Sequence, residues 1–196
     1  MSTASSVPLR NLQPYFTPKI PNSETPEIER LIASLGLLKH IEGGYFVETD
    51  RDSFRIPNPF LHSPVSSLAT SITASQSVTR NASTTIYYFL SPESSIGAFH
   101  RNKGRTIHTL HWGRGRYVII HADEVSGNGE KARVETFVVG KDVASGEKLQ
   151  WIVEGGKYKA SFLLPDEESC GGEPRSQGLL ISEVGHSFTI MYGNFF

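Results

Sequence analysis

The chain has 196 residues, a formal net charge of −1 and a hydrophobic content of 38%. This length suits one domain with a buried core, and the balanced charge excludes the broad basic surface that nucleic-acid binding requires. No segment reaches the roughly 18 consecutive apolar residues of a membrane span. A single cysteine, Cys170, excludes an intramolecular disulfide. We therefore expect a cytoplasmic protein with neither a nucleic-acid nor a membrane partner.

The first segment, residues 1–24, is rich in Ser, Pro and Asn and is predicted to be disordered. A helix is predicted next. Thr25 suits its N-cap, Pro26 its first position and Gly36 its end. Apolar residues recur at helical spacing between these positions, so one face of the helix is expected to pack on a sheet.

After the helix the hydrophobic pattern changes to the two-residue period of β-strands. Residues 44–50 form the first predicted strand, and residues 52–80, which are Ser/Thr/Pro-rich and without period, are predicted to form a long inserted loop. Short apolar runs separated by glycine turns fill residues 83–184. Many short strands and one helix predict an all-β sandwich or barrel, with residues 25–196 as a single domain.

Two histidines are the first candidates for chemistry. His100 and His108 lie near the ends of two adjacent predicted strands, at an even separation, so an extended path would turn both toward one face. A histidine pair of this kind can bind a metal ion or move protons. The alternative is two ordinary polar residues near the mouth of a barrel.

A second set of candidates precedes and follows a pair of glycines. His40 and Glu42 stand before the first predicted strand, and Phe46 and Glu48 share one face of it. A carboxylate beside an aromatic ring on an inward face is a candidate for ligand binding or general-base catalysis. The alternative is an acidic face that is simply solvated.

Tyrosines and arginines complete the candidates. Tyr87 and Tyr88 are adjacent in an apolar strand, so one of them must face inward and its hydroxyl then needs a partner; alternation allows either. Arg101 and Arg105 belong to a basic stretch around the following turns. Beside a cavity these cations would favour an anionic ligand, and elsewhere they would be surface charges.

The order of these motifs resembles the Cupin_5 branch of the RmlC-like cupins, over roughly residues 28–184 and with closeness to fungal-type members. The resemblance implies a cupin jelly-roll β-barrel with an internal small-molecule cavity, usually as a homodimer. It rests on His40-x-Glu42-Gly43-Gly44-Tyr45, then Ser83-Thr-x-Ile86-Tyr87, then Phe99-His100-Arg101.

The resemblance also implies where a metal-binding cupin would hold its ion. The four ligand positions fall at Ala98, His100, Thr106 and Lys159, so one imidazole of the usual set remains, and a charged lysine cannot coordinate. We therefore expect no cofactor. A site that His108 partly restores is the alternative.

Three functions stay open at this stage. The first is a small-molecule-binding cupin, in the form of a metal-independent isomerase or epimerase-like enzyme acting on an anionic or sugar-like metabolite; this rests on fold-level likeness. The residues assigned to it are His100 as base, Glu48 or Glu42 as its orienting partner, and Tyr87 or Tyr88 as acid. The ligand-binding groups are His40, Glu42, Arg101, Arg105, His108 and Lys159.

The other two functions come from different classes. A metal-dependent, oxygenase-type enzyme would use His100, His108 and either Glu42 or Glu48 as ligands, with open positions for substrate. A non-catalytic ligand-binding or storage-like protein would keep the barrel and bind without turnover.

Overall fold

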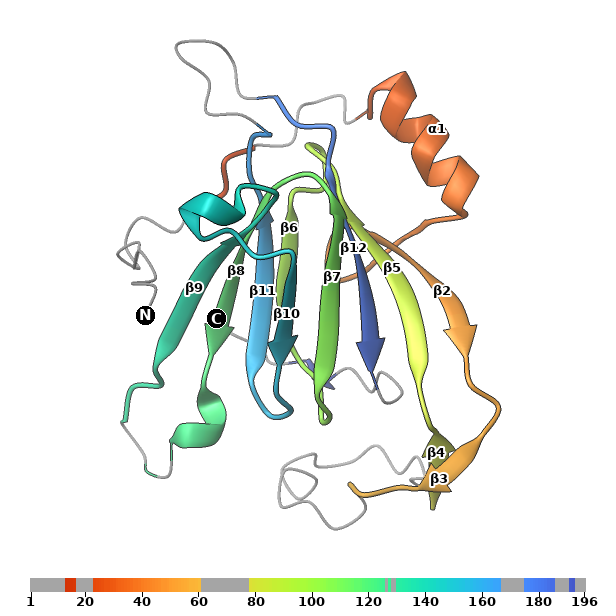
Figure 1. The fold of residues 1–196 in the computed structure, drawn as a ribbon, viewed down its shortest axis with the longest axis vertical. Helices are drawn as coiled ribbons and strands as arrows, with labels where there is room; N and C mark the ends of the chain where they lie inside the picture. Colours follow the sequence, from red (N-terminus) through yellow and green to blue (C-terminus); the bar gives the residue numbers. More distant parts are fainter. Residues whose placement is uncertain are drawn as a thin grey trace.

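The computed structural model describes residues 13–16, 23–60, 78–125, 127, 130–166, 175–185 and 191–192. These residues form two facing antiparallel sheets, a short hairpin and one α-helix (Figure 1). The prediction of an all-β domain with one N-terminal helix is confirmed. None of the helices in the described ranges is long and apolar enough to cross a membrane.

One sheet lies next to the helix and is called the helix-side sheet. Its six strands run in the order β1 (Leu38–Lys39), β2 (Tyr45–Arg51), β5 (Thr84–Leu90), β12 (Leu179–Gly185), β7 (Thr106–Trp112) and β10 (Gln150–Val153). The opposite sheet has the order β13 (Met191–Tyr192), β6 (Ile96–Arg101), β11 (Tyr158–Leu163), β8 (Gly115–Ile120) and β9 (Val134–Val139). Short 3₁₀ turns occupy Ala122–Glu124 and Val143–Ser145.

The helix α1 (Pro26–Leu35) begins and ends where the sequence predicts. The Thr25 hydroxyl accepts a hydrogen bond from the Ile28 amide at 3.4 Å, and Gly36 ends the helix with a φ of 65°. Figure 1 shows α1 beside β2 and β5. Its apolar face packs on the outer side of the helix-side sheet, where Phe89 and Leu180 are buried beneath it.

The main core lies between the two sheets. Each strand turns alternate side chains inward, as the two-residue period requires. The largest fully buried members are Leu90, Leu163, Leu179 and Ile181, and the rings of Tyr117, Phe137 and Trp151 pack among them. The polar side chains described below project into this same space.

Two parts of the chain differ from the prediction. Phe16 and Glu24 fall in the segment predicted to be disordered, yet Phe16 is buried in the core and Glu24 accepts a hydrogen bond from the Tyr45 hydroxyl at 3.0 Å. An isolated aromatic residue is enough to dock a polar segment when a core accepts it. The rest of 1–22, apart from 13–16, lies outside the described residues.

The segment 52–80 is also more ordered at its ends than predicted. Strands β3 (Arg55–Pro57) and β4 (Thr79–Asn81) pair as a short hairpin, and the Arg55 guanidinium donates to the Asn81 side chain at 2.8 Å. This pairing has no signal in the sequence, because three residues on each side are too few to show a period. Residues 61–77 lie outside the described residues.

Candidate active site

Polar side chains from both sheets converge inside the barrel. Lys159 projects from β11 in the opposite sheet, and His108 and Glu183 project from the neighbouring strands β7 and β12, where they face each other in register. His100 stands next to Lys159 on β6 in the paired register. Glu42 reaches the same space from the turn between β1 and β2, where its carbonyl accepts the Ala98 amide at 2.7 Å.

Lys159, His108 and Glu183 form a fully enclosed set that we call the lysine cluster. The Lys159 ammonium donates to His108 Nε2 at 2.7 Å and to Glu183 Oε2 at 2.6 Å, and its side chain is 2% exposed. The His108 ring stacks on Trp151, with 5.2 Å between ring centroids. A buried charge requires partners of this kind, because an unpaired one is strongly destabilising.

The lysine cluster fixes the protonation of its members. Burial lowers the pKa of His108, and the Lys159 charge lowers it further, so this imidazole is neutral. Burial by itself would raise the pKa of Glu183, but the charge of Lys159 outweighs it and holds that pKa well below its usual range. Glu183 is therefore ionised, and the pair with Lys159 carries no net charge.

Glu42, His40 and His100 form a second set, the glutamate cluster. Glu42 Oε2 lies 3.4 Å from His100 Nδ1 and 3.7 Å from His40 Nδ1. His40 Nδ1 also accepts the Glu42 amide at 3.3 Å, while His100 Nδ1 lies 3.0 Å from the Ala98 carbonyl oxygen. Glu42 Oε1 is buried without a hydrogen-bond partner among the described residues.

Burial reverses the usual order of the pKa values of Glu42 and His100. It raises the pKa of Glu42 to about 7, against the attraction of Lys159. It lowers the pKa of His100 to about 4, with the Lys159 charge acting in the same direction. At neutral pH, His100 is a free base and Glu42 is close to half protonated. The His100 side chain is 19% exposed, so this cluster lies nearer to solvent than the lysine cluster does.

The two tyrosines lie on opposite sides of the helix-side sheet. Tyr88 faces the interior and donates a hydrogen bond to the Gly43 carbonyl at 2.9 Å. A Cβ atom at Gly97 would lie 2.5 Å from that hydroxyl, so glycine there makes room for it. Burial raises the Tyr88 pKa far above its usual range. Tyr87 packs on the outer side beneath α1, 5.4 Å from the His111 ring.

Three other predicted site residues lie away from both clusters. Glu48 is exposed and receives a hydrogen bond from Arg51 Nε at 2.9 Å, beside an irregularity in the pairing of β2 with β5. The Arg101 guanidinium lies over the Tyr158 ring, 4.9 Å from its centroid. Arg105 pairs at the surface with Glu154 at 3.3 Å. The structure thus brings together His40, Glu42, Tyr88, His100, His108 and Lys159 of the predicted residues.

Glu183 is a charged member of the site that sequence reasoning missed. A signal for it exists, because Leu179, Ile181 and Glu183 share one face of an apolar strand, and a carboxylate on a buried face needs a cation. Tyr117 was also missed; its ring meets His108 edge-on at 5.6 Å. It lies in a run of apolar residues that reads as ordinary core.

A divalent metal ion does not fit the lysine cluster as it stands. The Lys159 ammonium lies between the imidazole and carboxylate that could coordinate an ion, and it has no lone pair to offer. Within the described ranges, no three His, Cys, Asp or Glu side chains are grouped to hold a metal.

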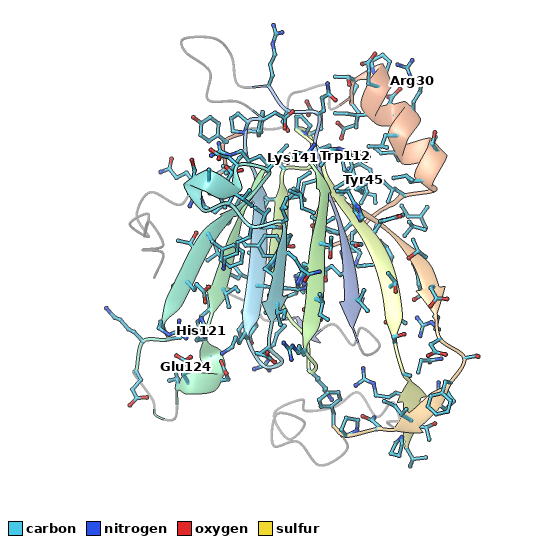
Figure 2. All side chains as sticks on the ribbon, viewed as in Figure 1. Arg30, Tyr45, Trp112, His121, Glu124 and Lys141 are labelled. Carbon is cyan, nitrogen blue, oxygen red and sulfur yellow. The ribbon has the colours of Figure 1, made fainter. Side chains whose placement is uncertain are left out.

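A cavity of about 920 Å³ opens elsewhere, around the turn between β7 and β8. Its lining includes Trp112, Arg114, Lys141 and Glu147, and none of its lining residues belongs to either cluster. Figure 2 shows Trp112 and Lys141 at the end of the barrel opposite His121 and Glu124. Within this lining, Arg114 is paired with Glu147 at 2.6 Å.

Comparison with known proteins gives a family and a fold. The model of the Cupin superfamily (DUF985) matches residues 29–186. An uncharacterised protein of Saccharomyces cerevisiae is 42% identical over 174 residues, which is 88% of this chain and 77% of the yeast protein.

Solved structures agree on the fold. A hypothetical protein from Leishmania major superposes with a TM-score of 0.60 at 24% identity, covering 84% of this chain and 81% of its own. A protein from Shewanella oneidensis gives a TM-score of 0.55 at 20% identity, covering 82% and 78%. At these identities the likeness concerns the fold alone.

Proposed function

This chain belongs to the Cupin superfamily (DUF985), with its jelly-roll barrel, and we propose that it is a small-molecule-binding cupin that moves protons on its ligand without a metal ion. The reaction class is an isomerisation or epimerisation, in which a proton leaves a carbon next to a carbonyl group and returns to the ligand. The single observation that carries this proposal is Glu42, a buried carboxyl group with one unpartnered oxygen and a pKa of about 7.

Glu42 suits proton transfer better than His100 does. A general acid–base group works best when its pKa lies near the working pH, and that condition describes Glu42. His100, with a pKa of about 4, is a weak base that stays neutral beside it. The roles that the sequence suggested are therefore exchanged in this proposal: Glu42 takes and returns the proton, and His100 orients its carboxyl group.

Lys159 supplies the electrostatic part of the proposal. Two of its three N–H groups are used by His108 and Glu183, which leaves one donor for a ligand oxygen. A fixed ammonium group stabilises the negative charge that develops on a carbonyl oxygen when the adjacent carbon loses its proton. Since Arg101 and Arg105 lie elsewhere, a sugar-like ligand with hydroxyl and carbonyl groups fits better than a polyanionic one.

The test uses ligand screening followed by hydrogen exchange. Thermal-shift screening of aldoses, ketoses and small keto acids should find a stabilising compound, because a ligand that binds only the native state raises its stability. Incubating the protein with that compound in D₂O should incorporate deuterium at one carbon, observed by proton NMR, after EDTA treatment as before it. Deuterium incorporation that EDTA abolishes would favour the metal-dependent alternative.

Matched variants assign the residues. We expect His100→Ala and Glu42→Gln each to weaken ligand binding at least tenfold, and Glu42→Gln to stop deuterium incorporation. Glu48→Gln, at the exposed carboxylate of the same segment, should leave both unchanged. Binding without exchange in the wild-type protein would instead support a non-catalytic binding protein, and unaltered exchange in Glu42→Gln would remove Glu42 from the proposed role.

The homodimer and the cytoplasmic location belong to the same proposal. Both come from the family resemblance and the sequence, and light scattering of the purified protein measures the first. A mass corresponding to two chains is expected.

A further inference from the structure

Asn102 is a buried residue whose side-chain amide has no partner. It is 7% exposed, and its Oδ1 and Nδ2 atoms are both buried without a hydrogen bond to any described residue. In the part of the chain that the structure describes, it is the only residue with two such atoms. Buried polar groups in native proteins are nearly always hydrogen-bonded, because an unpaired one is destabilising. An amide that folding leaves unpaired is therefore suited to a group that comes from outside the chain.

Asn102 lies next to the glutamate cluster. His100 faces Lys159 in the pairing of β6 with β11, and Asn102 follows His100 by two residues. The Gly156 amide donates to the Asn102 carbonyl at 2.9 Å, so the two strands are still joined at this residue. Alternation along an extended strand turns the Asn102 side chain to the same inner side as that of His100. It stands one step nearer to the end of the barrel where Figure 2 shows His121.

The amide restricts the chemistry of the group that Asn102 can bind. It presents N–H donors and a carbonyl acceptor side by side. A carboxylate would use only the donors and an ammonium group only the acceptor, so either would leave part of the amide unpaired. Two neighbouring hydroxyl groups satisfy both atoms, because one can donate to Oδ1 while the other accepts from Nδ2. A sugar carries such a pair, and a simple keto acid does not.

We infer that Asn102 is a ligand-binding residue that recognises two neighbouring hydroxyl groups, and that the ligand of the barrel is a sugar rather than a keto acid. The inference rests on the proposed function for the place of the ligand, whose carbonyl oxygen meets Lys159. Asn102 is the diagonal neighbour of Lys159 across β6 and β11. Such neighbours lie about 7 to 8 Å apart, so a short sugar can contact both side chains.

The first experiment measures the stability of the protein without added sugar. Leucine is close to asparagine in size and lacks its polar atoms, so Asn102→Leu should raise the melting temperature. Asn81 is the matched control because both of its polar atoms are partnered: Oδ1 accepts from the Arg55 guanidinium at 2.8 Å, and Nδ2 donates to the Asp52 carbonyl at 2.5 Å. Asn81→Leu should lower the melting temperature. Lower melting temperatures in both Asn102→Leu and the smaller Asn102→Val would show that the Asn102 amide is already satisfied, and would overturn the inference.

The second experiment measures binding by isothermal titration calorimetry. The probes are D- and L-erythrulose, short ketoses with two neighbouring hydroxyl groups, and 3-deoxyerythrulose, which lacks one hydroxyl of that pair. The wild-type protein should bind one erythrulose at least about tenfold more tightly than the deoxy compound, because a site built around a hydroxyl group rejects an analogue without it. Asn102→Leu should lose this preference, and Asn81→Leu should keep it.

The outcomes separate this inference from the proposed function. Binding of neither erythrulose by the wild-type protein, or the same preference in Asn102→Leu as in the wild type, overturns the inference. A preference that depends on Asn102 in a protein that incorporates no deuterium supports the sugar contact and removes the proton transfer. Deuterium incorporation with an erythrulose affinity that Asn102→Leu leaves unaltered does the reverse.

Discussion

The barrel contains two arrangements of a lysine, a histidine and a carboxylate, and they differ mainly in their distance from water. Lys159 contacts His108 and Glu183 in the interior, and Lys157, two residues earlier, contacts His121 and Asp123 at the end of the barrel. The lysine–imidazole distances are close, 2.7 Å inside and 2.9 Å outside.

The partners of the two lysines differ in number and exposure. The outer arrangement, which we call the rim cluster, consists of His121, Asp123, Glu124, Arg133, Glu135 and Lys157. Lys157 has two carboxylate neighbours there, Asp123 and Glu124. The side chains of Glu124 and Arg133 are 43% and 55% exposed. In the lysine cluster all three side chains are buried, and Lys159 contacts one imidazole and one carboxylate. Loss of a lysine contact is therefore expected to change the free energy of unfolding little at the rim and strongly in the lysine cluster.

The largest expected effect is on the free energy of unfolding, and it compares the lysine cluster with the rim cluster. Lys159→Met leaves the Glu183 carboxylate buried without its cation, which is expected to cost about 3 to 5 kcal/mol of unfolding free energy. Lys157→Met removes a similar contact beside exposed charges and is expected to cost less than about 1 kcal/mol. Urea unfolding of the two variants measures both. Equal losses would mean that burial does not separate the two clusters.

The fold itself was largely readable from the sequence. Strand periodicity placed most strands, and Thr25 and Gly36 bounded the helix, because each of these signals is local. The short strands β1, β3, β4 and β13 were missed because two or three residues cannot display a period. The burial of Phe16 depends on a core assembled from distant parts of the chain, and no local signal reports that.

The residues of the site could be predicted from the sequence, but the contacts between them could not. His100 and His108 were found because histidine is unusual on apolar strands, and His40 and Glu42 because they stand just before the pair of glycines that opens the first predicted strand. Which of them meet depends on register across two sheets, and a bulge between β6 and β11 shifts that register beside His100. Spacing along the chain could not show that Lys159 would lie between His108 and Glu183.

A second prediction concerns the pH dependence of stability, to which Glu42 and His100 contribute in opposite directions. In the unfolded chain, Glu42 and His100 should titrate near 4.5 and 6.5; in the folded protein their pKa values are about 7 and about 4. Between these limits folding moves one proton from the imidazole to the carboxyl group without changing the total. The contributions of the two groups to the pH dependence of stability therefore nearly cancel.

Replacing one of the two residues should make the contribution of the other to the pH dependence of stability measurable. In Glu42→Gln only His100 remains; the unfolded state binds more protons, so stability relative to wild type should rise with pH between about 4 and 6.5. In His100→Gln only Glu42 remains, and stability should fall as pH rises between about 4.5 and 7. Each change should amount to about 1 to 3 kcal/mol after screening, at 1.36 kcal/mol per pKa unit.

Urea unfolding at a series of pH values measures these slopes. The double variant should be as flat as the wild-type protein, and His111→Gln, on the outer side of the helix-side sheet, serves as the control. Parallel slopes in the two single variants would contradict the exchange of acidities within the glutamate cluster.

The smallest effect concerns salt. Charges at the rim are exposed to counterions, and the screening length falls from about 10 Å at 0.1 M to about 3 Å at 1 M ionic strength. The cost of Lys157→Met should therefore fall toward zero when NaCl is raised to 1 M, whereas the cost of Lys159→Met should stay within about 0.5 kcal/mol, because salt screens a buried pair much less than an exposed one. Unfolding in urea at the two salt concentrations measures both costs. A loss in Lys159→Met that salt reduces as strongly as the one at Lys157 would place water and ions around Glu183, and the lysine cluster would then be an extension of the rim.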